Sequence, residues 1–257
     1  MIRDLQKANM WKRISAALAD LIILVVVIEG AILLLAAAFD FGSYMEQRTA
    51  LEQKYIEQYG VDRDITEEEL NAMPEEQRNT YKAKVEAANR AYQSDPAVAE
   101  VFGKLYSLAV MIATISILFA FVVLELIVPL ILKNGQTIGK KIFGVAVMRI
   151  DGVKVSPVIV FARGILGKCT IGTLVPIYLL MMVIFGILGI VGLAVLAALL
   201  IAQVILFFAT EYHTPIHDKF AQTLTVDMAS QRIFDSVEEM LEYQKQIAAE
   251  EAETRER

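Results

Sequence analysis

LYSLAVMIATISILFAFVVLELIVPLIL, Leu105 to Leu132, is a run of 28 residues in which Glu125 is the one charged side chain. A helix needs about 20 apolar residues to cross the roughly 30 Å hydrocarbon core of a bilayer. A second run, Ile14–Phe39, is also long enough and contains no Lys or Arg. It is too long for the apolar part of a cleaved signal sequence, and Gly42-Ser43-Tyr44 is a poor cleavage site. We therefore predict that both runs are membrane-spanning helices.

A third apolar run, Leu174–Ala209, has 36 residues, too many for one ordinary crossing. Gly186-Ile187-Leu188-Gly189 lies inside it and favours a tight turn between two crossings, over about residues 174–186 and 189–209. One tilted or partly re-entrant helix is the alternative. The chain is 56% hydrophobic, and its charged residues, 21% of the total, are segregated from these runs. We predict an all-α multi-pass membrane protein with about four transmembrane helices, or three under the alternative.

The distribution of Lys and Arg predicts the orientation, because cytoplasmic loops of membrane proteins carry an excess of both. Residues 1–13 carry four basic side chains and one acidic one, and residues 133–170 carry seven and one. Residues 41–104 carry eight basic and thirteen acidic side chains. We therefore expect the N-terminus and residues 133–170 to be cytoplasmic and residues 41–104 to lie outside. If the third run crosses twice, the C-terminal tail is cytoplasmic too.

Residues 41–104 have the signals of an extracytoplasmic helical insertion. The helix of the first crossing is expected to continue outward until Gly60, and Thr66 with Glu69 fits a capping box. Asp95-Pro96 suits the N-cap and first position of the helix that enters the membrane again. We interpret the insertion either as a solvated helical bundle or as a docking surface for a protein partner.

The segment NGQTIGKKIFGVAVMRIDG, Asn134–Gly152, combines glycines with basic residues. Three residues separate Gly135 from Gly139, whereas a nucleotide-binding P-loop needs four, so the spacing does not match. Asp-Gly between strand-like residues is a strong hairpin signal. The sequence therefore predicts a small juxtamembrane β-hairpin on the cytoplasmic side, in which residues 145–150 pair with residues 154–156.

Ser156-Pro157 is expected to cap a helix that runs to about Lys168. This helix is predicted to be amphipathic and to lie in the plane of the membrane interface. Its apolar side would consist of Val158, Ile159, Ala162, Ile165 and Leu166. The negative surface of the inner leaflet attracts basic side chains. Five of them are therefore predicted to bind lipid headgroups, namely Lys140, Lys141, Lys154, Arg163 and Lys168.

Three acids, Asp20, Glu29 and Glu125, lie inside the predicted spans. A charge at the bilayer centre costs at least ~2.5–3.5 kcal/mol, and no basic residue lies within the spans to offset it. Each carboxyl is therefore neutral, paired with Arg13 or Arg163 at the interface, or part of a proton or cation path. Pro129 removes the N–H that would bond to the Glu125 carbonyl, which leaves an acceptor free beside this acid. We take the three acids as a candidate ion or proton site.

The remaining residues give few signals for other chemistry. His213 and His217 have the spacing of zinc ligands on a helix, but Pro215 lies between them, so no metal site is predicted. We expect Asp218 to pair with Lys140 or Lys141. No Ser–His or Cys–His arrangement indicates an enzyme, and no cofactor is implied. The net charge of −6 argues against nucleic acid as a partner, and residues 227–257 are predicted to form an acidic helical tail.

Several stretches resemble the RDD family of bacterial membrane proteins. They are MWKRISAALADLIILVVV from Met10, NGQTIGKKIFGVAVMRIDG from Asn134, FARGILG from Phe161 and HDKFAQTLTV from His217. The arginine and two aspartates that define the family correspond to Arg13, Asp20 and Asp218. Lys141 and Gln222 stand where the family pattern has Arg and Gly. The resemblance implies a membrane domain over residues 1–226, in which residues 41–104 are an unusually long insertion.

The resemblance also implies a place in the bacterial cytoplasmic (inner) membrane and a part in transport, with Na⁺/H⁺ antiport suggested for some relatives. Two functional hypotheses follow. The first is a transporter that moves protons or monovalent cations through the intramembrane carboxylates. The second is a non-catalytic membrane scaffold that binds a protein partner or assembles as a homo-oligomer.

Overall fold

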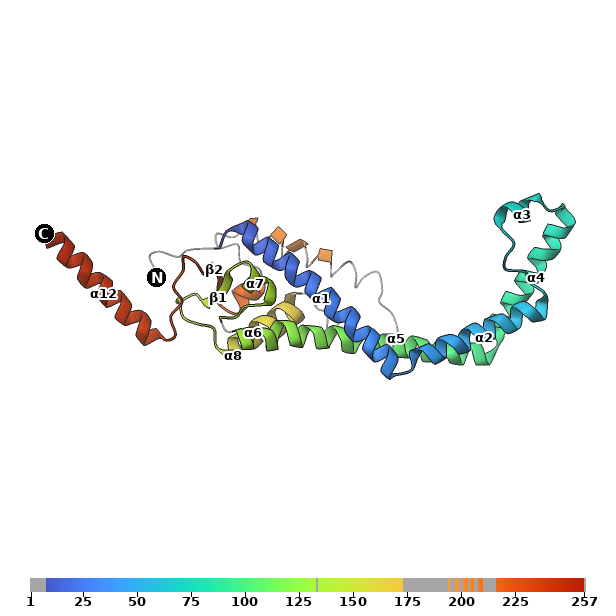
Figure 1. The fold of residues 1–257 in the computed structure, drawn as a ribbon, viewed down its shortest axis with the longest axis horizontal. Coiled ribbons are helices and arrows are strands. Elements are labelled where there is room, and N and C mark those ends of the chain that lie inside the picture. The colour runs from blue at the N-terminus through green and yellow to red at the C-terminus, as the bar shows by residue number, and fades with distance from the viewer. Residues whose placement is uncertain are drawn as a thin grey trace. The chain divides into compact units, whose positions relative to one another are not determined.

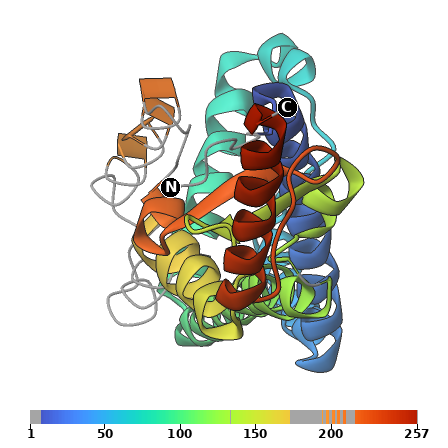
Figure 2. The same cartoon turned by 90° about the vertical axis from the view of Figure 1, so that its left-hand side faces the viewer.

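The computed structural model of the 257-residue chain describes residues 8–132, 134–172 and 216–256, with a few helical positions between 194 and 209. The chain forms two compact units, one of Met1–Ala31 with Thr114–Arg257 and one of Ile32–Ala113. Their elements are drawn in Figure 1 and, turned by 90°, in Figure 2.

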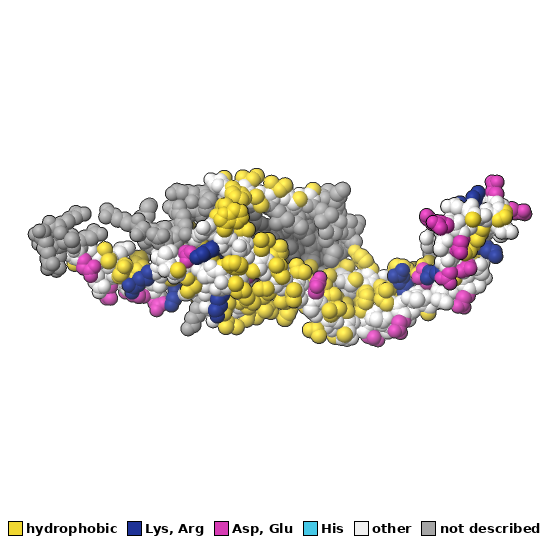
Figure 3. Space-filling view, turned by 45° about the horizontal axis from the view of Figure 1, so that its top comes forward, with side chains coloured by type: hydrophobic (Ala, Val, Ile, Leu, Met, Phe, Trp, Pro, Cys, Tyr) yellow, Lys and Arg dark blue, Asp and Glu magenta, His cyan; other side chains and the backbone are white. Residues whose placement is uncertain are grey.

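Two helices of the described residues are long and apolar enough to cross a membrane. The first is α1 (Met10–Ala38). The second runs without a break through α5 (Pro96–Val122), the π-helical turn η1 (Val123–Ile127) and α6 (Val128–Leu132). The first covers the predicted crossing Ile14–Phe39 except for its last residue, and the second contains the predicted crossing Leu105–Leu132. Hydrophobic side chains gather on their exposed surface (Figure 3). The predicted crossings at 174–186 and 189–209 lie almost wholly outside the described residues.

The unit Ile32–Ala113 is helical, as predicted, with one difference. The first helix does not continue to Gly60: α1 ends at Ala38, and α2 (Phe41–Tyr59) begins after Asp40, whose φ of 52° breaks the helix. Two further helices follow, α3 (Glu67–Ala72) and α4 (Glu75–Ser94), and α4 packs beside α2. The prediction missed this break because no Gly or Pro marks it.

The predicted helix signals in this unit are confirmed. Thr66 and Glu69 form the capping box at the start of α3, and Gly60 ends α2 with a φ of 62°. The Asp95 side chain accepts the N–H of Ala97 at 2.8 Å and so caps α5. Tyr55 donates its hydroxyl to Asp95 at 2.7 Å, which ties α2 to the start of α5.

In the other unit, the antiparallel pair of strands is not the local hairpin that the sequence predicted. The strand β1 (Val145–Arg149) pairs with the distant strand β2 (Thr223–Asp227), in a register that places Val147 opposite Thr225. The Asp151-Gly152 turn is present, but across it only Met148 and Lys154 form an isolated bridge. Pro157 lacks an N–H and starts a helix, so the segment after the turn is too short to form a second ladder strand.

The helix after the turn differs from the predicted amphipathic helix in the place of Arg163, which is buried against the protein. Ser156 caps α8 (Pro157–Phe161), as predicted, by accepting the N–H of Ile159. The chain continues as the π-helix η2 (Ala162–Gly172). The inward side carries Val160, Arg163, Gly164 and Gly167, whereas Val158 is 75% exposed and Leu166 is also exposed. The apolar residues Val158 and Leu166 lie on the exposed side and Arg163 on the buried side. Contact of the exposed side with the membrane stays a prediction.

Two short elements complete this unit. The helix α11 (Ile216–Phe220) packs against η2 and leads into β2. Gly167 permits this contact, because a Cβ there would lie 3.0 Å from the Cβ of His217. The helix α12 (Val237–Glu256) lies in the predicted acidic helical tail 227–257, of which residues 227–236 are not helical.

Candidate functional site: a charged cluster

The unit of Met1–Ala31 with Thr114–Arg257 contains a group of ionisable side chains that interact electrostatically. They come from five elements of this unit. We call this set the charged cluster. Its members are Arg13 and Asp20 of α1, Glu125 of η1, Lys140 of α7 (Ile138–Ile142), Arg163 and Lys168 of η2, and His217 and Asp218 of α11. Arg13, Glu125, Arg163 and Asp218 are buried.

Asp218 is the most buried of these groups, with 1% of its residue surface exposed. Arg163 donates Nε–H to its Oδ1 at 2.6 Å, and the hydroxyls of Thr223 and Thr225 donate at 3.2 and 3.3 Å. The two threonines are two residues apart on β2, so their side chains point to the same face. Burial alone would raise the pKa of Asp218, but the attraction of the Arg163 guanidinium prevails and holds this pKa well below its usual range.

The predicted partners of Asp218 were wrong. Arg163 pairs with it, while Lys141 is exposed on α7. The physical reason is that the side of the α8–η2 helix that carries Arg163 packs inward, where η2 meets α11. For the same reason Arg163, with 8% of its surface exposed, does not face lipid headgroups as predicted.

Asp20 holds the first turn of α7 against α1. Its carboxylate accepts the hydroxyl of Thr137 at 2.5 Å and the backbone N–H of Gly139 at 2.7 Å. Thr137 in turn caps α7 by accepting the N–H of Lys140. The expected ion pair of Asp20 with Arg13 or Arg163 is therefore replaced, in the described residues, by two hydrogen bonds from neutral donors.

Glu125 forms an ion pair with Lys168, which reaches it from η2. Lys168 was expected at the headgroups, and it instead neutralises this buried acid. Pro129 frees the Glu125 carbonyl, as predicted, and the helix forms a π-helical turn there in which Val128 donates to Val123. Gly164 packs against the freed carbonyl so closely that a Cβ would lie 2.3 Å from its oxygen.

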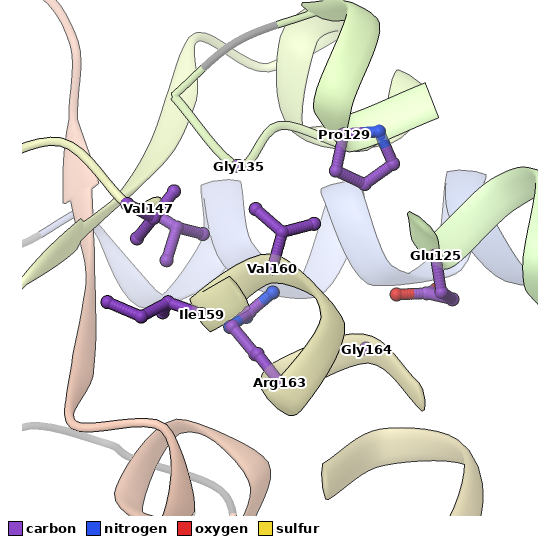
Figure 4. A pocket seen from close by; sticks show the side chains of 9 residues that line it. Glu125, Pro129, Gly135, Val147, Ile159, Val160, Arg163 and Gly164 are labelled. Atoms are coloured by element: carbon purple, nitrogen blue, oxygen red, sulfur yellow. The ribbon is translucent and has the colours of Figure 1, made fainter. Parts of the chain in front are cut away.

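A small cavity lies between Glu125 and Arg163, with Pro129 and Val160 beside it (Figure 4). Its volume available to a water molecule is about 10 Å³, which is room for about one water. Its lining is almost wholly apolar, so the cavity offers no set of polar atoms that could replace the hydration shell of a metal ion.

Besides Asp218, two members of the cluster outside the membrane-spanning helices have strongly shifted pKa values. Burial, followed by repulsion from Arg163, lowers the pKa of Lys140 to about 7, against the attraction of Glu125 and Asp20. Burial likewise lowers the pKa of His217 to about 3, so this imidazole is neutral at physiological pH. In the described part of the chain, no carboxylate lies within ion-pair distance of the Lys140 amine.

The candidate residues from the sequence separate into two groups. The three residues that the family resemblance singles out, Arg13, Asp20 and Asp218, all join the cluster, and so does Glu125. Glu29 lies nine residues beyond Asp20 on α1, at an exposed position, and is not one of the cluster residues. Lys141 and Lys154 lie at the surface, where contact with lipid headgroups stays a prediction.

Sequence reasoning missed the residues that hold the acids in place. Thr137 and Gly139 bind Asp20, and Thr223 and Thr225 bind Asp218. One signal was available: two threonines alternate on β2 just after Asp218. No group of three or more potential metal ligands occurs among the described residues, and His213 lies outside them.

Comparison with known proteins identifies the family of the chain. No curated protein and no solved structure gave a match. The model of the RDD family matches residues 7–222, which include all members of the charged cluster. With its two long apolar helices, the chain is a membrane protein. A match over this much of its length shows that the chain belongs to the RDD family.

Proposed function

We propose that this protein moves protons or monovalent cations across the membrane and that the charged cluster is the site through which they pass. One observation supports this proposal: charged groups meet near the ends of two apolar helices. They are buried carboxylates, the cations that pair with them, and one amine that has no ion-pair partner in the described residues. Ionisable groups within or beside membrane helices are costly and mark ion or proton paths in many membrane proteins.

We propose a matching topology, with four crossings in a bacterial inner membrane and the N-terminus in the cytoplasm. The support is the excess of basic residues in 1–13 and 133–170 over 41–104. The cluster then lies at the cytoplasmic ends of α1 and α5–α6, close to the water from which a proton would enter. Lys141 and Lys154 would contact the anionic inner leaflet beside it.

The test is ion flux through purified protein in liposomes, measured with a pH-sensitive dye and a panel of monovalent cations. Glu125→Gln removes a cluster charge at nearly constant volume and is expected to abolish flux. Glu46→Gln is the matched control, because Glu46 is exposed on α2 and outside the cluster. If liposomes that contain the wild-type protein move none of the tested ions, the proposed transport function is contradicted.

A second candidate is a non-catalytic scaffold, and one observation favours it. Each acid of the cluster already accepts hydrogen bonds or an ion pair, so the cluster is able to act as a structural clamp alone. The insertion 41–104 would then bind a partner, or copies of the chain would assemble. Under this reading Asp20→Asn lowers the melting temperature in detergent, and wild-type protein carries no flux.

A further inference from the structure

We infer that the Lys140 amine is the group that binds and releases the transported ion, and that this ion is the proton. The inference rests on the proposed transport function and names its cargo and its carrier. Its first support is that the carboxylates of the cluster already have hydrogen-bond or ion-pair partners.

The carboxylates of the cluster have donors in place. Asp218 holds Arg163 and two threonine hydroxyls, Glu125 holds Lys168, and Asp20 holds the hydroxyl of Thr137 and the N–H of Gly139. A sodium or potassium ion would have to displace these donors to gain oxygen ligands. A proton needs only a base with a free lone pair, which a neutral amine supplies.

Of the two lysines of the cluster, Lys168 pairs with Glu125, whereas the described residues provide no ion-pair partner for Lys140. Its position is nevertheless fixed, because its backbone N–H bonds to Thr137, whose hydroxyl is bound by Asp20. The family-defining Asp20 therefore positions the short helix that carries the amine. Lys141, next along the same helix, is exposed.

Charges from every neighbouring element act on the Lys140 amine. They are Asp20 from α1, Glu125 from η1, Arg163 and Lys168 from η2, and His217 and Asp218 from α11. With His217 neutral, the part of the cluster that the structure describes has three acids and four cations, namely Arg13, Lys140, Arg163 and Lys168. The cluster is thus balanced when Lys140 is neutral and carries one excess positive charge when it is protonated.

An excess charge in a poorly solvated site is unfavourable, whereas the balanced state is not. The lowering of the pKa of Lys140 to about 7 agrees with this count. In the proposed step one N–H bond of the ammonium breaks, the proton leaves to water, and the nitrogen keeps the electron pair. Uptake reverses the same step, so no other bond and no co-reactant is required.

The first experiment is proton flux in liposomes with three variants. Lys140→Arg keeps a positive charge that does not dissociate near neutral pH, since the guanidinium pKa lies above about 12. Lys140→Met keeps most of the volume and removes the charge. Both are expected to reduce proton flux to that of protein-free liposomes, whereas Lys219→Met, at an exposed lysine of α11 outside the cluster, retains it.

The second experiment observes the amine itself, in wild-type protein in lipid nanodiscs. Lysines are ¹³C-dimethylated, and the signal that disappears in Lys140→Arg is assigned to Lys140. This signal is expected to titrate near neutral pH.

The outcomes separate the two ideas. If wild type moves protons and Lys140→Arg moves them equally well, Lys140 is not the carrier, although the protein is a transporter. A Lys140 signal that titrates only at alkaline pH leads to the same conclusion. Wild-type flux of sodium or potassium without proton movement overturns the proton as cargo. Absence of all flux by wild type overturns the transport function, and the carrier role with it.

Discussion

Gly139 donates its backbone N–H to the carboxylate of Asp20 at 2.7 Å, and no side chain fits between them. A Cβ on residue 139 would lie 2.3 Å from the Ala16 carbonyl oxygen and 2.8 Å from Oδ1 of Asp20. The first of these atoms is backbone and cannot move aside. The glycine is therefore required by the closeness of α7 to α1, and Asp20 is placed where it reaches the N–H that the glycine exposes.

Gly139→Ala tests this closeness. We expect a loss of about 1–3 kcal/mol in the free energy of unfolding, the usual cost of overpacking, and therefore a lower melting temperature in detergent. Gly103→Ala is the matched control, because it is also helical and nothing lies within 4 Å of the Cβ it would add. Equal melting temperatures for the two variants would contradict the contact.

Asp218→Asn leaves Arg163 buried without a countercharge, and breaking a buried pair in this way costs about 3–5 kcal/mol. The pKa of Asp218 is held below its ordinary value of 3.8 in the fold. Its stabilisation is therefore complete above that value and is lost as the pH falls through the lower folded pKa. Melting curves should show the largest difference between wild type and variant above pH 4, with convergence in stronger acid. A difference that does not depend on pH would show that the charge of Asp218 is not what stabilises the fold.

His217 gives a pH dependence in a milder range. Its pKa falls from an ordinary 6.5 to about 3 in the fold, because burial opposes the charged imidazolium. Between these values the unfolded chain takes up a proton that the folded chain refuses, so stability decreases as the pH falls below about 6.5. His217→Gln should lose less melting temperature than wild type between pH 7.5 and pH 5. The idea fails if the two proteins respond alike.

Lys168→Met should destabilise the protein because it strands the buried Glu125 carboxylate. The expected loss is below the ~3–5 kcal/mol of a fully buried pair, since 33% of the Lys168 side chain is exposed. Lys141→Met, at an exposed lysine of the same segment 133–170, should leave the melting temperature unchanged. If both variants melt like wild type, Lys168 makes no stabilising contact with Glu125.

The proposed topology is tested with single cysteines on a Cys169→Ser background. Ser94 on α4 and Ser230 after β2 are both exposed, so either accepts a thiol reagent if the reagent reaches its side of the membrane. In right-side-out vesicles, an impermeant maleimide should label Ser94→Cys at once and Ser230→Cys only after permeabilisation. Labelling of both before permeabilisation would reject the proposed topology of four crossings.

Local signals in the sequence predicted local structure well. The capping box at Thr66, the stop at Gly60 and the cap at Ser156 each depend on a few neighbouring residues, and each is present. The two crossings were predictable because length and apolar content alone decide whether a helix can span. The break at Asp40 was missed, since its left-handed φ has no sequence marker such as glycine.

The partners of charged residues were predicted less well, because they depend on contacts between distant segments. The sequence identified Asp20, Glu125 and Asp218, but their partners lie 119, 43 and 55 residues away, at Gly139, Lys168 and Arg163. The strand β1 was likewise predicted, whereas its partner was taken from the nearest extended segment. Nothing local to Val145–Arg149 distinguishes residues 154–156 from residues 223–227 as the pairing strand.

The pairing of β1 with β2 sets an order of events during synthesis. Ribosomes build the chain from its N-terminus, so β1 and Arg163 leave the ribosome well before Asp218 and Thr223–Asp227 exist. During that interval Arg163 lacks its carboxylate, and the backbone groups of β1 lack their ladder. The last apolar run, Leu174–Ala209, must also be made before either partner arrives. A nascent chain arrested before Asp218 therefore cannot close the charged cluster, whatever the state of its membrane helices.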